Sequence, residues 1–244
     1  MGRKLAYSVS GREHWISAVG GLVGILAVLW VGHFWLGAHG GVLAIASMGA
    51  SAVLLFAAPH GALSQPWPVF GGHLVSALIG VACARWLGYE PMLAASLAVA
   101  LSIAAMFSLR CLHPPGGATA LYAVLGGETV HALGYDYVFS PVLLNVTVLV
   151  AVAVAFNYPF AWRRYPQNWY RATAETNRLA NPLLATEEEA MIPHSDLVYA
   201  LSQIDTFVDI SEEDLQRIYA LALKHAQPHQ AESLVALLAP SADI

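Results

Sequence analysis

The residues that decide the fold are 91–127, PMLAASLAVALSIAAMFSLRCLHPPGGATALYAVLGG. The first part, Pro91–Leu109, is apolar and approaches the roughly 20 residues that a helix needs to cross a bilayer. A break follows at residues 113–117, where two prolines remove backbone donors and two glycines loosen the chain. Apolar sequence resumes over Pro114–Gly127, about 14 residues and so roughly 21 Å of helix. That segment either shares the membrane depth with the extended residues before it or forms a re-entrant half-helix.

Further apolar runs lie on both sides of this stretch: Trp15–Leu36, Gly41–Ala58, Gly71–Tyr89 and Val138–Trp162. In lipid each backbone amide must be satisfied within its own helix. The composition agrees with burial in lipid, since 57% of residues are hydrophobic, 11% are charged and the mean hydropathy is +0.58. We therefore predict an all-α, polytopic transmembrane bundle of about six segments.

The distribution of charge predicts the orientation and the division into domains. Through Arg164 the chain carries seven Lys or Arg residues and four acids, whereas the remainder carries four and twelve. Basic residues before the first run and after the last predict that both ends lie inside a bacterial-type inner membrane, and hence an even number of crossings. Six crossings follow if the Pro114 segment spans, and four follow if it and the Gly41 segment both dip and return.

The chain becomes polar after Trp162. We expect a transmembrane domain at 1–164, a polar linker at 165–193 and a small helical cytoplasmic module at 194–244. The module shows amphipathic patterns at Asp196–Ile204, Glu212–Ala226 and Gln230–Leu238. Ser211 and Asp214 resemble a capping box at the start of the second pattern.

A short internal echo suggests two related halves. Residues 49–54, GASAVL, resemble residues 117–122, GATALY, and each lies in the second of three apolar segments. Three segments per half would make the halves inverted, as in many transporters. This predicts a 3+3 inverted repeat with broken helices.

The break at residues 113–117 is also the strongest candidate for a functional site. Broken backbone at membrane depth is tolerated where protein buries it or where it lines a watery cavity. A helix restarting at Gly116 or Gly117 would present amide groups and a positive dipole end, which suit an anion. The alternative is a tight interfacial turn, with Arg110 as the positive-inside anchor of the preceding helix.

Other residues have structural explanations of similar weight. A charge within a membrane segment costs at least about 2.5 kcal/mol, so Arg85 faces a partner or pathway, or snorkels to the interface. His60 and His73 suit an interfacial position, and Cys83 and Cys111 suit packing as small hydrophobes. The ten histidines show no metal-ligand spacing, so we expect no metal and no cofactor.

Three ordered motifs carry a resemblance to a known family. They are His113-Pro114-Pro115-Gly116-Gly117-Ala118-Thr119-Ala120, Gly49-Ala50-Ser51-Ala52-Val53-Leu54-Leu55-Phe56, and Ser64-Gln65-Pro66 followed by Gly71-Gly72-His73. Together they resemble the HPP family of integral membrane proteins over about Trp15 to Trp162. Chloroplast and cyanobacterial members are implicated in nitrite transport, so the resemblance implies passage of a small inorganic anion. Some bacterial relatives carry CBS domains, which the tail after Tyr165 does not resemble.

We therefore expect a midplane anion site between Gly49–Ser51 and Gly116–Thr119. His113 and Arg110 would guard its inner side, and His113 is the natural carrier if protons are cotransported. Gln65 and His73 match family positions and would support the inner vestibule. The substrate-binding candidates are Gly49, Ala50, Ser51, Gln65, His73, Arg85, Arg110, His113, Gly116, Gly117, Ala118 and Thr119.

Two other functions compete with transport. A membrane enzyme would need a nucleophile and base, a ligand cluster or a cofactor motif, and the sequence shows none, so we expect no catalytic residues. A membrane sensor would use the acidic C-terminal module to bind a partner. The expected partners are the lipid bilayer, a small inorganic anion and a second copy of the chain in a dimer. An acidic net charge of -5 argues against nucleic acid.

Overall fold

The computed structural model describes residues 11–40, 45–167, 215 and 218–219. The chain divides into two compact units, Met1–Arg171 and Ala172–Ile244, and the second unit is almost entirely outside the described residues. The predicted linker and the amphipathic module therefore also lie outside them, apart from Leu215, Ile218 and Tyr219. The fold below is that of the first unit.

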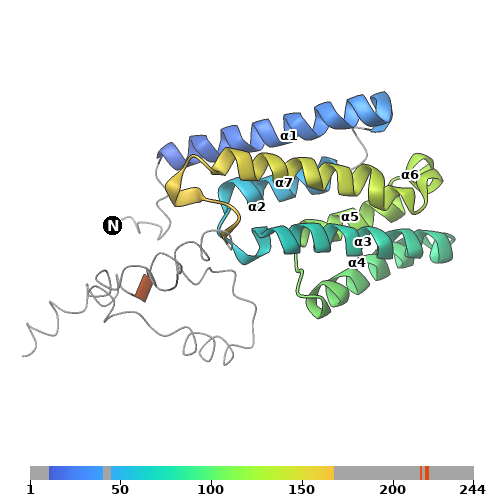
Figure 1. Cartoon of the computed structure of the whole chain (residues 1–244). Helices are drawn as coiled ribbons and strands as arrows, with labels where there is room; N and C mark the ends of the chain where they lie inside the picture. Colours follow the sequence, from blue (N-terminus) through green and yellow to red (C-terminus); the bar gives the residue numbers. More distant parts are fainter. Residues whose placement is uncertain (1–10, 41–44, 168–214, 216–217, 220–244) are drawn as a thin grey trace, which may run out of the picture. The chain divides into compact units, whose positions relative to one another are not determined.

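The described part of the first unit is helical, with no strand (Figure 1). Its elements are α1 Gly11–Gly40, α2 Ile45–Ala57, α3 Pro66–Leu87, α4 Pro91–Ser108, α5 Pro114–Leu125, α6 Glu128–Leu133 and α7 Leu144–Asn157. Short turns of other helix types lie at Ala62–Ser64 (η1), Val138–Leu143 (η2) and Ala161–Arg163 (η3). The six apolar segments predicted from the sequence are confirmed as helices, and they run alternately in opposite directions (Figure 1).

Four of these segments are long and apolar enough to cross a membrane: Gly11–Trp35, Pro66–Leu87, Pro91–Ser108 and Val138–Asn157. The last joins η2 to α7 across a kink at Ser140, which has non-helical backbone angles just before Pro141. The remaining two helices, α2 with 13 residues and α5 with 12, are short. At 1.5 Å per residue they extend roughly 20 and 18 Å, less than the about 30 Å of bilayer hydrocarbon. Length and composition thus give four full spans and two short helices, where the sequence predicted about six segments and left four or six crossings open.

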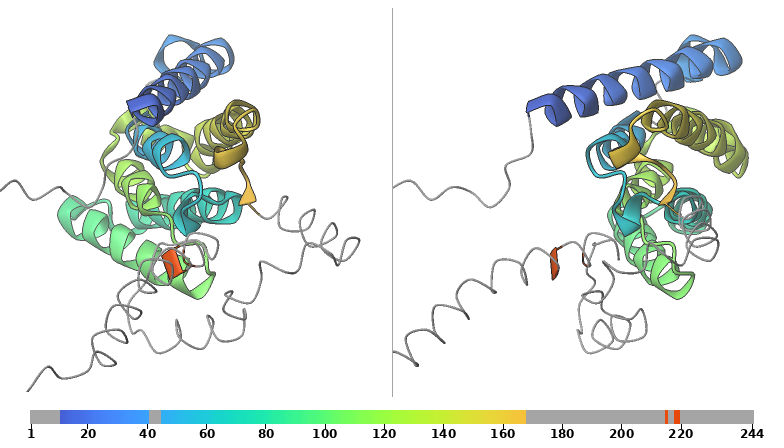
Figure 2. Two further views of the ribbon diagram at one scale, coloured as in Figure 1. Left: turned by 90° about the vertical axis from the view of Figure 1, so that its left-hand side faces the viewer. Right: turned by 60° about the vertical axis from the view of Figure 1, so that its left-hand side comes forward.

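The two short helices occupy the middle of the bundle. Helix α2 packs on α1, α5 and α7, and α5 packs on α2, α3 and α4. Helices α1 and α4 lie at opposite edges, because α1 contacts α2 and α7 whereas α4 contacts α3 and α5 (Figure 2). The main apolar core joins Met48 and Leu55 of α2 to Val69 of α3 and Leu149 of α7. Polar side chains on α2 and α5 are therefore placed deep inside protein.

Proline positions explain where several helices begin. Pro66, Pro91 and Pro114 each occupy the first turn, where a missing N–H removes no helical hydrogen bond. Helix α3 begins five residues before the predicted apolar run because Pro66 starts it. Between the predicted segments that end at Gly127 and start at Val138, the chain forms the unexpected short helix α6, which follows Gly127 at a φ of 78°.

Candidate functional site

Four polar side chains from three helices form one hydrogen-bonded cluster at the centre of the bundle. The Oγ atom of Ser51 lies 2.8 Å from Nε2 of His73 and 2.8 Å from Nε2 of His113. The Nδ1 atom of His73 lies 2.7 Å from Oγ1 of Thr119. All four side chains are fully buried, with 0% of their surface exposed. We call Ser51, His73, His113 and Thr119 the histidine cluster.

The two short helices bring the cluster together. Ser51 lies in the second turn of α2, and Thr119 lies in the second turn of α5. His113 is the residue before α5, in an extended conformation that the following proline favours. His73 comes from the buried face of α3, so both hydroxyls reach the same imidazole ring.

Backbone carbonyls complete the hydrogen bonding. Nδ1 of His113 bonds the carbonyl of Leu63 at 2.8 Å, and Ser51 and Thr119 are 3.1 Å and 3.4 Å from the carbonyls four residues before them. The hydroxyl of Tyr137 donates to the carbonyl of Thr119 at 3.2 Å. Among residues 45–167, no carboxylate, lysine or arginine is hydrogen-bonded to the histidine cluster. The site is therefore polar, buried and built from groups that are neutral unless an imidazole takes up a proton.

Close packing of α3 on α5 holds the histidines in place. A Cβ atom on Gly72 would lie 2.6 Å from Cβ of His113, and one on Gly116 would lie 2.7 Å from the carbonyl oxygen of Gly72. Small residues at such a seam let two membrane helices approach closely. Gly116 N–H already donates to the His113 carbonyl at 2.8 Å. Gly116 thus has a packing role, whereas the sequence predicted a free amide for an anion.

The other predicted residues of the two motifs lie at the edge of the site. Ala50 and Ala118 are exposed, and Gly117 is half-buried, where an added Cβ would meet Val99 at an ordinary contact distance of 3.9 Å. Gly49 is half-buried and lines a hollow between α1 and α2, together with Ser17. Of the two matching motifs, only the hydroxyl residues Ser51 and Thr119 belong to the histidine cluster.

Arg110 and Gln65 lie outside the histidine cluster. Arg110 is exposed at the end of α4 with a φ of 53°, and the Cys111 N–H bonds the Met106 carbonyl across it at 2.9 Å. This is the Schellman arrangement that ends many helices, usually with glycine at the left-handed position. The Gln65 amide donates to the Pro59 and Gly61 carbonyls, and its oxygen accepts from Gln167 N–H, so it ties loops together.

Arg85 lies at the other end of α3, away from the histidine cluster. Its guanidinium sits 5.7 Å from the ring centroid of Tyr135, a cation–π distance. It lines a half-open hollow of about 170 Å³ with His131, Gly134 and four apolar residues of α3, α5 and α6. His131 donates from Nε2 to the Val124 carbonyl at 2.8 Å. Arg85 is exposed in the last turn of α3 and has Tyr135 as a partner, so its position agrees with both interpretations.

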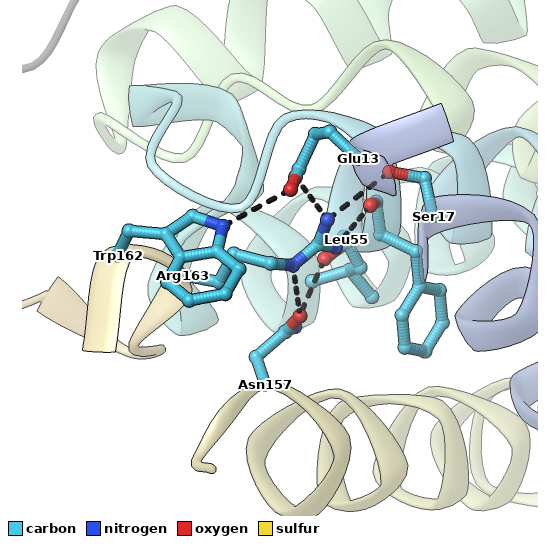
Figure 3. Close-up of polar contacts among 7 residues, drawn as sticks. Glu13, Ser17, Leu55, Asn157, Trp162 and Arg163 are labelled. Atoms are coloured by element: carbon cyan, nitrogen blue, oxygen red, sulfur yellow. Dashed lines mark hydrogen bonds and ion pairs between the residues drawn. The ribbon is translucent and has the colours of Figure 1, made fainter. Parts of the chain in front are cut away.

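A second polar cluster was not foreseen from the sequence. Arg163 is only 1% exposed and forms an ion pair with Glu13 of α1 (Figure 3). It also donates to Asn157 at the end of α7, to Ser17 of α1 and to the Phe56 carbonyl at the end of α2. The indole of Trp162 donates to the second carboxylate oxygen of Glu13 at 3.0 Å. We call this group the Arg163 cluster; it joins the ends of three helices.

Sequence reasoning treated Arg163 only as one of the basic residues after the last membrane segment. The available signal was the single acid, Glu13, at the start of the first segment. The start of α1 and the end of η3 lie on the same side of the bundle, so the charges of Glu13 and Arg163 can meet. Asn145 of α7 was missed too: it is 1% exposed, and its amide nitrogen and oxygen have no hydrogen-bond partner.

The described residues contain no group of three or more His, Cys, Asp or Glu side chains placed to hold a metal ion. The two cluster histidines contact each other edge-on, with ring centroids 5.0 Å apart. Hydroxyls and imidazoles can donate to or accept from a small polar ligand and can relay protons.

Four apolar spans, two short central helices and a buried polar cluster define a polytopic helical membrane protein. Within that class, the sequence model described as "HPP, transmembrane region" matches residues 6–166, and the chain belongs to the HPP family. Two transmembrane proteins of Dictyostelium discoideum are similar to it. One is 37% identical over 132 residues, which cover 53% of this chain and 42% of the relative. The other is 38% identical over 129 residues, which cover 52% of this chain and 45% of the relative. The chain thus spans less than half the length of these relatives, and no solved structure matches it.

Proposed function

We propose that the protein is a membrane transporter or channel, not an enzyme, and that it carries a small inorganic anion, nitrite in particular. The observation that carries the proposal is the fully buried histidine cluster, in which Ser51 and Thr119 both contact His73. Buried polar groups within a membrane bundle usually mark a substrate or ion pathway. The anion itself is chosen from the family resemblance.

The chemistry of the cluster suits a monovalent oxyanion. Two hydroxyls and two imidazoles can each turn a proton toward an acceptor, and they replace part of the hydration shell that the anion loses. A permanent buried cation would hold an anion too strongly for release, whereas these groups bind it reversibly. The short helices α2 and α5 place one hydroxyl each, which supports the proposal that the two halves are related as an inverted repeat.

The proposed orientation places both ends of the bundle in the cytoplasm of a cell with an inner membrane. The contact between Glu13 and Arg163 puts the start of α1 and the end of η3 on the same side. Arg12 and Arg164 lie at that end, and basic residues favour the cytoplasmic face. Arg85, with its hollow beside Tyr135, would then lie at the outer end and attract anions toward the bundle.

Anion flux into proteoliposomes tests the function. The purified full chain is reconstituted, and uptake of nitrite, nitrate, formate and chloride is compared with uptake by protein-free vesicles. We expect protein-dependent uptake with nitrite the fastest. If the protein moves none of these anions, the proposal is wrong.

A further inference from the structure

The hydrogen bonds of the histidine cluster fix the position of every mobile proton when both histidines are neutral. The Leu63 carbonyl can only accept, so Nδ1 of His113 carries a proton and Nε2 is an acceptor. Ser51 is the donor within reach of that Nε2, at 2.8 Å against 3.1 Å to the Ser47 carbonyl, so we assign its proton to His113, and it accepts from Nε2 of His73. His73 therefore has a bare Nδ1, to which the Thr119 hydroxyl donates. The cluster is one directed chain from Thr119 to Leu63.

This chain can also hold one extra proton without losing a hydrogen bond. A proton arriving at Thr119 displaces the hydroxyl proton to Nδ1 of His73, whose Nε2 proton passes to Ser51, and Ser51 passes its own to His113. The three hydrogen bonds among the cluster side chains have then reversed, Nδ1 of His113 still donates to the Leu63 carbonyl, and His113 carries the added charge. The Thr119 hydroxyl now points to the Pro115 carbonyl at 3.4 Å, and the Ser51 hydroxyl to Nε2 of His73. Each proton that leaves one atom binds the next, so the sum is one proton gained.

No neighbouring charge compensates the protonated state. Of the elements packed on α3, helices α4 and α7 carry no titratable residue, η1 and η2 carry none, and α5 carries Tyr122. Helix α6, which packs on the same end of α3 as Arg85, carries exposed Glu128 and His131, and exposed Asp136 and buried Tyr137 precede η2. Helix α2, packed on α5, carries none. The loop before His113 carries buried Cys111 and exposed Arg110, and the far part of α3 carries Cys83 and Arg85. The carboxylates among these described residues, Glu128 and Asp136, are exposed, and neither is hydrogen-bonded to the cluster.

We infer that the protein carries its anion together with one proton, taken up by the chain of Thr119, His73, Ser51 and His113. This inference rests on the anion transport proposed above. An imidazolium is costly in a buried apolar setting unless an anion lies beside it. An anion is equally costly there without the imidazolium, and the two binding events strengthen each other by the same factor. The pair is neutral, so the transport cycle moves no net charge.

The experiment measures nitrite uptake and lumen pH together in proteoliposomes that hold the full chain and a trapped pH indicator. Slightly alkaline buffer keeps nitrous acid scarce, and protein-free vesicles give its leak. We expect nitrite to acidify the lumen at the rate at which it enters, one proton per anion. An imposed pH gradient, acid outside, should drive accumulation, and a potassium diffusion potential of either sign should leave the initial rate unchanged.

Two variants interrupt the proton chain of the histidine cluster. His113→Gln keeps hydrogen-bonding groups but cannot carry a proton, and we expect proton-coupled uptake to fall roughly tenfold or more. Ser51→Ala, which interrupts the chain at its middle, should fall similarly. Protein-dependent nitrite uptake that follows the membrane potential and leaves the lumen pH unchanged would overturn proton coupling but keep anion transport. Absence of any protein-dependent anion uptake would overturn both.

Discussion

Oγ of Ser51 and Nε2 of His113 lie 2.8 Å apart although 62 positions separate them in the chain. Ser51 comes from the short helix α2, and His113 directly precedes the short helix α5. Their contact, with His73 between the two hydroxyls, brings together three motifs that are separate in the sequence.

Removing the hydroxyl of Thr119 should impair transport without unfolding the protein. Thr119→Val has nearly the same shape but leaves Nδ1 of His73 without a donor, which costs about 1–3 kcal/mol. We expect nitrite flux to fall at least roughly tenfold. Thr119→Ser keeps the hydroxyl and should retain flux within about threefold. Equal flux in both variants would remove Thr119 from the path.

The two cluster histidines should be in opposite tautomers. The Leu63 carbonyl accepts a hydrogen bond from Nδ1 of His113, which places a proton on that nitrogen. The Ser51 hydroxyl then accepts from Nε2 of His73, which places the His73 proton there. Nitrogen-15 spectra of histidine-labelled protein in nanodiscs would show this at alkaline pH, with assignments from His73→Gln and His113→Gln. The same tautomer on both rings would contradict the directed chain.

The adjacent glycines of α5 should behave differently. An added Cβ on Gly116 would lie 2.7 Å from the Gly72 carbonyl oxygen, whereas one on Gly117 meets only Val99, at 3.9 Å. Gly116→Ala should therefore destabilise the bundle by roughly 1–3 kcal/mol. Gly117→Ala should be neutral or stabilise it by up to about 1 kcal/mol, because alanine favours helix. Thermal unfolding in detergent measures both, and a stable Gly116→Ala protein would contradict the close α3–α5 contact.

Breaking the Arg163 cluster should destabilise the protein strongly. Glu13→Gln leaves a buried guanidinium without its counter-charge, and one-sided removal from such a pair costs roughly 3–5 kcal/mol. The matched control is Arg164→Ala, because Arg164 is exposed and surface charges contribute about 0–1 kcal/mol. Unfolding temperatures compare the two. Similar losses would mean that the ion pair is not buried in the working protein.

Arg110 should act through its backbone. Its φ of 53° favours glycine, so Arg110→Gly should keep stability and flux, while Arg110→Val should lose about 1–2 kcal/mol. Stability and nitrite flux are measured for both. A loss of flux in a stable Arg110→Gly protein would instead restore the predicted role of the guanidinium in the anion path.

Much of the fold follows from the sequence because length and hydropathy act locally. Spans such as Pro91–Ser108 are set by bilayer thickness, and Pro114 fixes where α5 begins. The motifs containing Ser51 and Thr119 were predicted to meet, and they do, at His73.

The remaining features depend on contacts between distant segments. His73 was a candidate only through its match to family positions, as support for an inner vestibule, because position near a helix start says nothing about what packs against it. Gly116 was expected to bind an anion, but the approach of Gly72 gives it a packing role. The burial of Arg163 could not be predicted from the sequence, because it depends on the convergence of the start of α1 with the ends of α2 and α7.

The most direct test asks whether the anion reaches the histidine cluster. Nitrite is titrated into nitrogen-15 histidine-labelled full chain in nanodiscs, and the imidazole signals of His73 and His113 are followed. We expect both to shift with nitrite, in a saturable way, and Thr119→Val to weaken the response of His73. Nitrite transport by the same preparation without any change in either signal would contradict the account.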